Sequence, residues 1–551
     1  MSNSGCLNPH AVYFNGNIIT MAPSNPKVEA VAVLGDRIAA VGTASRIRSM
    51  AGPETKVVDL AGKTMVPGLI EPHNHFILYG PLALSRVDLS SPPVGAIRNI
   101  KELQSALREK ASQTPAGMWV LGFGYDDTLL EEKRHPNRQD LDQVSTGHPI
   151  LIFHTSMHLL AANSKALAAA EVTQDTPPPV GGVIRKDPQT GSPDGVFEEA
   201  AMGLFLKLMP KPPLERRLEL FKQGEEVFLR RGVTSCYDAG VSFPGVGGDD
   251  IAVYQTAFAR SDLRLRFTMM IEAQFLMKQA GGFLTGFGNE RLKIGPAKII
   301  GDGSIQLYTA WLTQPYFVPF KGDKSYRGYP VTPPEQLNRL VMEAHRAGCQ
   351  ISVHGNGDAT IDAILEAFRQ AQKAHPRPDA RHRIEHCQTV REDQLDLIAE
   401  LGISPSFFVS HTFYWGDRHK NIFLGPERAA RISPLKSALK RGIRFSVHSD
   451  CPVTPVSPLF CASAAVNRVT SSGEVLGPEF RLTPEEALRA VTLDAAWQNF
   501  DDRVKGSIEP GKLADFTLLA ENPLTAPPES IRDIQVTEVI IGGRQVYPGG
   551  G

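Results

Sequence analysis

From residue 232 onward, short β-prone runs alternate with longer helix-prone stretches, and this alternation constrains the fold more than any other feature of the chain. The intervals hold amphipathic segments such as 334–348 and 358–374, which predict helices. The capping sequence Thr-Pro-Glu-Glu from 483 predicts another helix over 484–496. An earlier β-prone run brings the number of expected strands to eight: 66–73, 232–238, 264–271, 294–301, 350–354, 382–386, 403–408 and 443–448. A repeat of this kind predicts an α/β protein with a TIM-like (β/α)8 barrel.

Several of the expected strands end on a side chain that can bind a metal. The first leads into a His-Asn-His triplet, and because side chains alternate along a strand, the two histidines point to one face. Later strands lead to a His or an Asp, and one carries a Lys. Active sites of such barrels lie at the carboxyl ends of the strands, so these side chains are expected to converge. In chain order, the candidates are His73, His75, Lys298, His354, His386 and Asp450.

Four segments around these residues carry a more specific pattern. They are Lys-x-x-x-Asp-Gly-Ser from 298, His-Gly-Asn-Gly-Asp from 354, Arg-Ile-Glu-His from 383 and Ser-Asp-Cys-Pro-Val from 449. With the order His-x-His, Lys, His, His, Asp, the chain resembles the amidohydrolase superfamily, metal-dependent hydrolases built on a (β/α)8 barrel. Within that superfamily it is most similar to the branch containing N-substituted formamide deformylases. The resemblance covers nearly the whole chain.

The resemblance implies a centre of two divalent metal ions, with Zn2+ as the first choice and manganese, nickel or iron fitting the same ligands. A protonated lysine has three donors and no acceptor, so Lys298 fits only as the carbamate formed with carbon dioxide, which could bridge both ions. By resemblance, the remaining ligands divide into His73, His75 and Asp450 for one ion, and His354 and His386 for the other.

Two alternatives to this assignment stay open at the level of sequence. Lys298 could be an ordinary strand lysine that pairs with Asp302. A mononuclear site could use His73, His75 and Asp450 alone.

The implied reaction is hydrolysis of a carbon–nitrogen bond, other than a peptide bond, in a small molecule. The ions would acidify a bridging water, the hydroxide would attack the carbonyl, and Asp450 would pass the proton to the leaving nitrogen. An N-substituted formamide or another hydrophobic amide is the expected substrate. A lactone, a carbamate or a cyclic amide is the alternative. A non-catalytic barrel is disfavoured because all six ligand positions are filled.

Four further residues are candidates for substrate contact. His158 matches, by resemblance, a cavity-facing histidine of an inserted segment, with a lid-packing role as the alternative. Tyr414 and Trp415 belong to an aromatic stretch after the seventh strand and would line an apolar pocket. In the same stretch, His411 is a candidate for holding the oxyanion. His448 is expected to be a core histidine with satisfied hydrogen bonds, although a place beneath the metals is the alternative.

The regions outside the barrel repeat predict two further units. Residues 1–64 and 506–551 consist of short strands and tight turns, and neither end could bury enough surface alone, so they are expected to form one composite β-sandwich. The barrel would occupy residues 65–505. The interval between its first two strands is far longer than one β-α unit, which predicts an inserted α/β subdomain at about 80–215. At its centre, residues 149–158 are expected to form one strand that leads into a helix over 164–170.

Composition narrows the class of partner. The 551 residues include 58 basic and 59 acidic ones, which gives no electrostatic reason to expect nucleic acid or a membrane as a partner. We expect no secretory signal and no membrane helix, since no apolar run approaches ~20 residues. The six scattered cysteines suit reduced thiols, so a cytoplasmic protein is expected. Its partner would be a small-molecule substrate, and the resemblance allows a homodimer.

Overall fold

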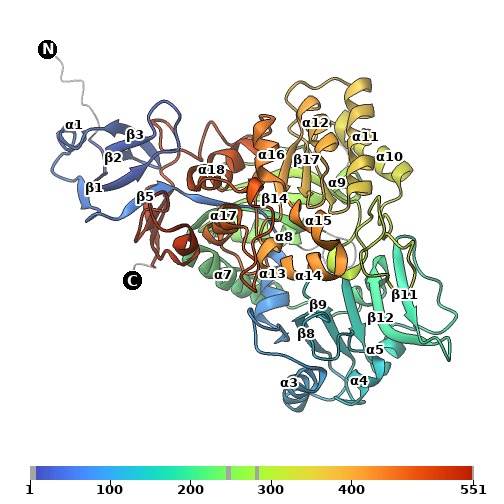
Figure 1. Ribbon diagram of the computed structural model, residues 1–551. Helices are drawn as coiled ribbons and strands as arrows, with labels where there is room; N and C mark the ends of the chain where they lie inside the picture. The colour runs from blue at the N-terminus through green and yellow to red at the C-terminus, as the bar shows by residue number, and fades with distance from the viewer. Residues whose placement is uncertain (1–7, 243–249, 279–283, 549–551) are drawn as a thin grey trace.

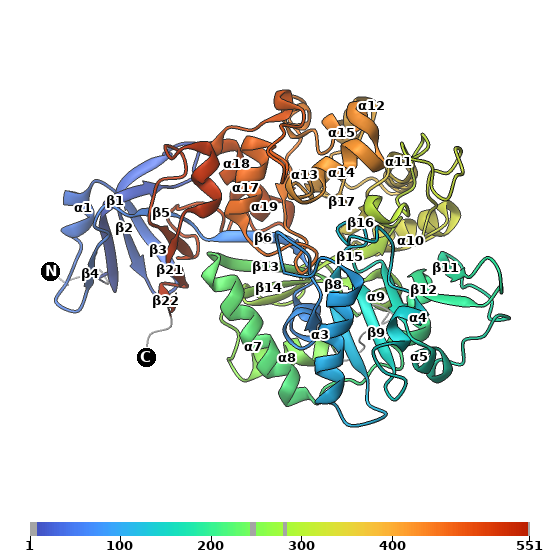
Figure 2. The same ribbon diagram turned by 60° about the horizontal axis from the view of Figure 1, so that its bottom comes forward.

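The computed structural model of the chain describes residues 8–242, 250–278 and 284–548. Within these residues, three β-sheets organise the molecule. Figures 1 and 2 show a sheet built from the chain termini at one end, the barrel in the middle, and the sheet of the inserted segment beside the barrel on the other side.

The central sheet contains eight strands whose spatial order follows their order along the chain. Every neighbouring pair is parallel. Each strand overlaps one of the runs expected from the sequence, which confirms the barrel repeat. In order they are β6 (Leu69–Asn74), β13 (Val233–Val241), β14 (Arg266–Glu272), β15 (Leu292–Ile300), β16 (Ile351–Gly355), β17 (Arg383–His386), β18 (Ser404–Phe407) and β19 (Ser446–Val447).

The two edges of this sheet, β6 and β19, are joined beyond the ends of their strands. The N–H of His75 donates to the carbonyl of Cys451 over 2.7 Å. The N–H of Ser449 donates to Oε1 of Glu71 over 3.0 Å. These contacts nearly close the barrel and bring the segment after β19 to the first strand.

Helices cover the outside of the barrel, and the longer ones, α7, α10 and α11, present an apolar stripe to it. In α10 the buried residues Leu337, Val341 and Ala344 recur at helical spacing. Both α10 and α11 start where the sequence predicts. The main outer helices are α7 (Leu214–Arg230), α8 (Asp250–Ala259), α9 (Ala273–Lys278), α10 (Pro334–Arg346), α11 (Asp358–Ala374), α12 (Glu392–Glu400), α16 (Leu435–Lys440) and α17 (Pro458–Asn467).

The single helix expected across 484–496 is wrong, because the structure has two shorter helices there. They are α18 (Pro484–Ala490) and α19 (Leu493–Gln498). The carbonyl of Val491 between them accepts the N–H of Ile70 over 2.8 Å. This carbonyl therefore pairs with the edge strand β6 instead of continuing a helix.

The inserted segment forms a six-stranded sheet in the order β11-β12-β10-β9-β8-β7. The expected strand before the helix at 164 is a hairpin, since β9 and β10 pair antiparallel. The strands are β7 (Val87–Asp88), β8 (Val120–Tyr125), β9 (Ile150–His154), β10 (Leu159–Ala162), β11 (Gly182–Lys186) and β12 (Pro193–Glu199). The helices α3 (Ile100–Ser112), α4 (Arg138–Asp142) and α5 (Ser164–Ala169) belong to the same segment.

Strands from both chain termini share the third sheet, in the order β22-β21-β20-β5-β1-β2-β3, with β4 beside β1. The expected strand 66–73 is two strands, and its first part, β5, belongs to this sheet. The strands are β1 (Ala11–Ile19), β2 (Lys27–Leu34), β3 (Arg37–Gly42), β4 (Lys56–Asp59), β5 (Thr64–Pro67), β20 (Phe516–Leu519), β21 (Val536–Ile541) and β22 (Arg544–Tyr547). The sandwich arrangement and the domain boundaries stay predictions.

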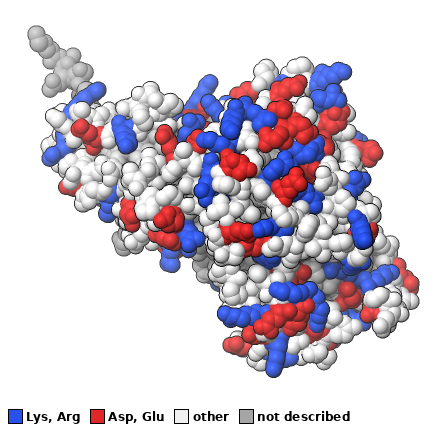
Figure 3. Space-filling model, viewed as in Figure 1, with Lys and Arg blue, Asp and Glu red and all other residues white. Residues whose placement is uncertain are grey.

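The distribution of charge on the surface and the state of the cysteines agree with what the composition indicates. On the face shown in Figure 3, basic and acidic side chains are interspersed. The five described cysteines are buried and free. Among the described residues, no helix combines the length and the apolar character needed to cross a membrane.

Candidate metal centre

The six side chains expected as metal ligands lie at one mouth of the barrel. They come from five strands or the turns that follow them: β6, β15, β16, β17 and β19. All are buried except His75, whose side chain is 14% exposed. Five of the six line the same cavity or its floor: His75, Lys298, His354, His386 and Asp450. The sixth, His73, is fully buried beside them.

Asp450 lies between the two groups of histidines. Its Oδ1 is 3.2 Å from Nε2 of His73 and 3.3 Å from Nε2 of His75. Its Oδ2 is 4.0 Å from Nδ1 of His386. The rings of His386 and His354 follow, with centroids 4.3 Å apart. One carboxylate can therefore serve both halves of the site.

Several buried atoms of this cluster have no hydrogen-bond partner, which is costly unless a further group satisfies them. They include Nε2 of His73, Nδ1 of His386, Nζ of Lys298 and Oδ1 of Asp450. Burial lowers the pKa of His75, and it lowers the pKa of His354 and His386 well below the usual range. Neutral imidazoles are the form that binds a metal. This set of donors fits divalent cations.

Lys298 does not form the ion pair that was one alternative for it. The carboxylate of Asp302 instead accepts the backbone N–H groups of Trp311, Asn356 and Gly357 at 2.8–3.0 Å. Burial lowers the pKa of Lys298 to about 8. Since only the neutral amine reacts with carbon dioxide, this environment favours carboxylation, which stays a prediction.

Glu385 orients His73 and is a residue that the sequence analysis missed. Its Oε2 lies 2.6 Å from Nδ1 of His73, while Oε1 accepts from Arg383 and Ser352, each over 2.7 Å. Burial raises the pKa of Glu385, but Arg383 and His73 outweigh this and hold the pKa well below its usual range. A proton on Nδ1 of His73 leaves Nε2 free as a ligand atom, as in other carboxylate–histidine pairs.

Backbone conformation explains how both Glu385 and its neighbour His386 reach the site. In a regular strand, adjacent side chains point to opposite faces. His386 has φ 68°, and Asp450 has φ 56°, which is the left-handed region that non-glycine residues rarely adopt. Such strain costs on the order of 1–3 kcal/mol and concentrates at functional sites.

His448 is not a core histidine with satisfied hydrogen bonds, and that expectation is wrong. Its side chain is fully buried, yet neither ring nitrogen has a partner in the described chain. Ligand atoms of His386, His448 and Asp450 lie within 4.8 Å of one another. Its ring is 4.7 Å from that of His73 and stacks on Phe408 at 5.0 Å. His448 is therefore an additional candidate ligand beneath the cluster.

A cavity of about 600 Å³ opens from the cluster toward the inserted segment. His158 lines it, and its ring lies 5.0 Å from that of His354. Its Nδ1 is 2.7 Å from Oε2 of Glu199. Glu199 also lines the cavity, has φ 51°, and is a residue that the sequence analysis missed. Burial lowers the pKa of His158, but the Glu199 carboxylate more than offsets this and raises it. Glu199 thus favours the doubly protonated ring of His158, whose second N–H could donate a hydrogen bond into the cavity.

The structure does not place His411, Tyr414 and Trp415 among the residues that line this cavity. Nδ1 of His411 lies 2.8 Å from Nε2 of His419, and Nε1 of Trp415 donates to Asp126 over 2.9 Å. Tyr414 packs against the ring of Phe460, 5.4 Å away. Their roles in substrate binding stay predictions. The inserted segment and the chain following it supply the apolar wall instead, through Leu82, Phe153, Met157, Met202 and Leu206.

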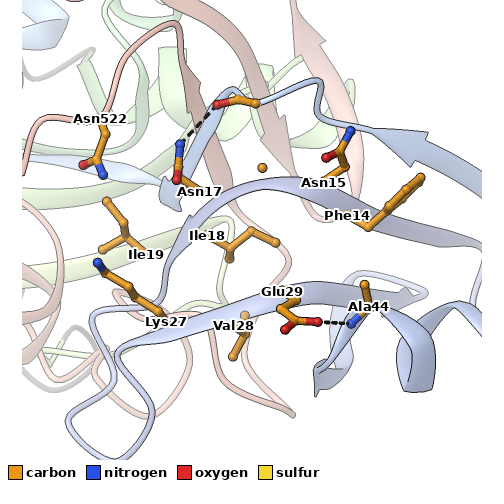
Figure 4. Close-up of a pocket in the computed structure, with 12 residues that line it drawn as sticks. Phe14, Asn15, Asn17, Ile18, Ile19, Lys27, Val28, Glu29, Ala44 and Asn522 are labelled. Carbon is orange, nitrogen blue, oxygen red and sulfur yellow. Dashed lines mark hydrogen bonds between the residues drawn. The ribbon is translucent and has the colours of Figure 1, made fainter. Parts of the chain in front are cut away.

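A second hollow, of about 620 Å³, lies against the terminal sheet (Figure 4). Its acidic residue, Glu29, accepts the N–H of Ala44 over 2.9 Å, and among the described residues that line it Lys27 is the basic one. None of the six expected ligands borders it. The barrel cavity, which does contain these groups, is the candidate active site.

Fold and donor set together define a metal-dependent hydrolase of the barrel type. A sequence model of the amidohydrolase family matches residues 56–547. The chain belongs to this family and is an amidohydrolase, an enzyme that acts on carbon–nitrogen bonds, as its sequence suggested.

Three comparisons with known proteins extend this result. The chain is 29% identical to an N-substituted formamide deformylase of Arthrobacter pascens over 96% of each chain. It is 30% identical to the protein LONG AFTER FAR-RED 3 of Arabidopsis thaliana, over 97% of this chain and 91% of that protein. The crystal structure of an uncharacterized metal-dependent hydrolase from Pyrococcus furiosus superimposes with a TM-score of 0.71 and 25% identity, covering 94% of this chain and all of that one.

Proposed function

We propose that the protein hydrolyses the carbon–nitrogen bond of a small non-peptide amide that carries a hydrophobic group, with N-substituted formamides as the first class to test. The observation that carries this proposal is the set of unpartnered, buried ligand atoms at one end of a largely apolar cavity. The Arthrobacter pascens relative supports the choice of formamides.

Two divalent ions, with zinc as the first choice, would be held by the six expected ligands, and Lys298 would act as a carbamate between them. His448 is a further donor within reach. When bound, the ions would polarise the substrate carbonyl and acidify a water molecule. Glu385 fixes the ring of His73 for this task through the 2.6 Å contact.

Asp450 is the proposed general base and acid. Burial raises its pKa, but His386, His73 and His75 outweigh this and hold the pKa well below the usual range, so the carboxylate is ionised and can accept a proton. An amine leaves poorly without a proton. Asp450 therefore takes the proton of the attacking water and returns it to the leaving nitrogen.

His158 is the proposed donor to the substrate carbonyl oxygen. It lies on the cavity wall beside His354, and Glu199 keeps it oriented. A donor placed there would stabilise the negative charge that develops on the oxygen during attack. The apolar walls exclude water and accommodate a hydrophobic substituent.

A panel of N-benzylformamide, N-benzylacetamide, a six-membered lactam and the matching lactone tests this function. We expect release of benzylamine from the formamide, loss of turnover after chelation, and recovery when Zn2+ is added back. Hydrolysis of the lactone alone would contradict amide hydrolysis as the function. Turnover that survives complete removal of metal would contradict the metal-dependent mechanism.

A further inference from the structure

Arg86 lies on the wall of the candidate active-site cavity, between η1 (Gly80–Leu84) and the short strand β7. Its Nε and Nη1 are buried and have no hydrogen-bond partner in the described chain. Its Nη2 contacts the sulfur of Met209 at 3.6 Å, and the guanidinium lies 4.5 Å from the centre of the Phe153 ring. These neighbours are apolar or only weakly polar.

No described acidic residue forms an ion pair with Arg86, because those at the cavity wall are otherwise engaged. Asp450 lies among the histidines of the cluster. The others have their own partners: Glu199 with His158, Asp250 with Arg217, and Glu272 with the N–H of Phe275. The charge of Arg86 is thus uncompensated by the residues that the structure describes.

An uncompensated buried charge needs a physical reason. A guanidinium stays protonated in proteins, and burying it without a partner is unfavourable. Contact with one aromatic ring offsets only part of this. Consistent with the geometry, burial lowers the pKa of Arg86 to about 9. An anionic ligand in the cavity would supply the missing charge.

We propose that the substrate of this cavity carries a carboxylate in addition to its amide, and that Arg86 binds that carboxylate. The planar guanidinium matches a carboxylate in geometry as well as in charge. The ligand cluster would take the amide, and an apolar side chain of the substrate would lie against residues such as Leu82 and Phe153. This inference rests on the proposed amide hydrolysis and narrows its substrate class to amphipathic acids such as N-formyl amino acids.

Two substrates that differ only in the carboxylate test the inference: N-formylphenylalanine and N-formyl-2-phenylethylamine. In the metal-loaded enzyme we expect kcat/KM to be about 10-fold or more higher for the acid, since a hydrogen bond to a charged group typically contributes that much. Arg86→Met should reduce kcat/KM for the acid by roughly 10- to 100-fold, mainly through KM, and leave the neutral amide nearly unchanged. An equal loss for both substrates, or none for the acid, would overturn the assignment.

Control variants separate the role of Arg86 from general effects on folding. Arg48 lies 4.5 Å from the centre of the Phe14 ring in the terminal sheet, so Arg48→Met removes a matched arginine–aromatic contact away from the cavity. This variant should leave kcat/KM unchanged for both substrates. Arg86→Lys, which keeps the charge, should retain part of the preference and covers the case in which Arg86→Met does not fold. Lys211 also lines the cavity, and a preference lost in Lys211→Met but not in Arg86→Met would refute the role of Arg86.

A binding measurement distinguishes failure of this inference from failure of the proposed function. Calorimetry on the metal-loaded protein would compare 3-phenylpropionate with the neutral 3-phenylpropanamide. We expect tighter binding of the acid and about a 10-fold or greater loss in Arg86→Met. If the acid binds through Arg86 while no formamide is cleaved, the proposed function fails and the anion site stands. If both formamides are cleaved equally and Arg86→Met binds 3-phenylpropionate as tightly as the wild type does, the anion site fails and the function stands.

Discussion

Asp450 connects the chemistry of this site to its backbone. Its two carboxylate oxygens face different histidines, and its backbone adopts the left-handed conformation with φ 56°. The local strain is held by contacts that tie the neighbouring residues to β6, including the 2.7 Å bond from His75 to Cys451. The residue is thus fixed in a conformation that it would rarely adopt alone.

Asp450→Asn should reduce kcat by roughly 10² to 10⁴-fold, because the amide cannot accept the proton. The fold should persist, since asparagine tolerates the left-handed conformation and has nearly the same shape. Steady-state kinetics and the thermal unfolding midpoint measure both effects. Asp396→Asn on the surface, where Asp396 pairs with Arg441, is the control and should behave like the wild type. Near-normal turnover in Asp450→Asn would rule out the proposed role.

The sequence alone identified candidate ligands that stand in a characteristic spacing and order along the chain, such as the triplet that contains His73 and His75. Glu199 and Glu385 were missed because their partners, His158 and His73, are distant in sequence and nothing local marks the pairing. His448 was misjudged for a related reason. Its residue type and position suited a core histidine with hydrogen-bonded ring nitrogens. Only the packing shows that these nitrogens have no hydrogen-bond partner in the described chain.

Among the helices and strands, the barrel repeat could be predicted because it depends on apolar periodicity. The points where one expected element divides into two could not be predicted. The run 66–73 reads as one strand but divides at Gly68, where an added Cβ would lie 2.2 Å from Oγ1 of Thr234. The run 484–496 reads as one helix but divides where Val491 pairs with Ile70. Both breaks depend on segments that are distant in sequence.

The buried carboxylate of Glu225 connects helix α7 to the turn before β14. Oε1 of Glu225 accepts the N–H groups of Arg264 and Leu265 at 2.8 and 2.9 Å, while Oε2 is buried without a hydrogen bond, 3.8 Å from Nε of Arg264. Burial raises the pKa of Glu225 to about 7. Because the folded-state pKa lies above the unfolded value, ionisation destabilises the fold increasingly as the pH rises from about 4.5 through about 7.

Glu225→Gln should therefore stabilise the protein by roughly 2–3 kcal/mol at pH 8, with a gain that shrinks toward pH 5. The amide oxygen keeps both backbone contacts, and the charge is removed. Urea unfolding at several pH values measures the effect. Glu226→Gln, which changes the neighbouring residue that pairs with Arg264 on the surface, is the matched control. A gain that did not depend on pH would contradict this account.

At the scale of the whole molecule, the terminal sheet and the barrel depend on each other. β5 pairs with β20 from the other end of the chain and leads directly into β6, which carries His73. Asp515, just before β20, forms a buried ion pair with Arg266 of β14, with Nε to Oδ2 at 2.6 Å. Long-range pairs of this kind could not be predicted from the sequence, which indicated only that strands from both termini would form one composite β-sandwich.

Asp515→Ala should destabilise the protein by about 3–5 kcal/mol, because it leaves Arg266 buried without its partner. Glu366→Ala removes a surface pair with Arg369, both partners being about half exposed, and should cost less than about 1 kcal/mol. The urea midpoint of the first unfolding transition compares the two. Equal effects would show that the buried pair does not couple the sheet to the barrel.

We propose that side chains from five barrel strands hold two divalent ions. Elemental analysis of the purified, dialysed protein measures the metal content per chain. We expect close to two ions per chain. About one ion would contradict the two-ion assignment, and a fully active protein with essentially none would contradict the metal centre itself.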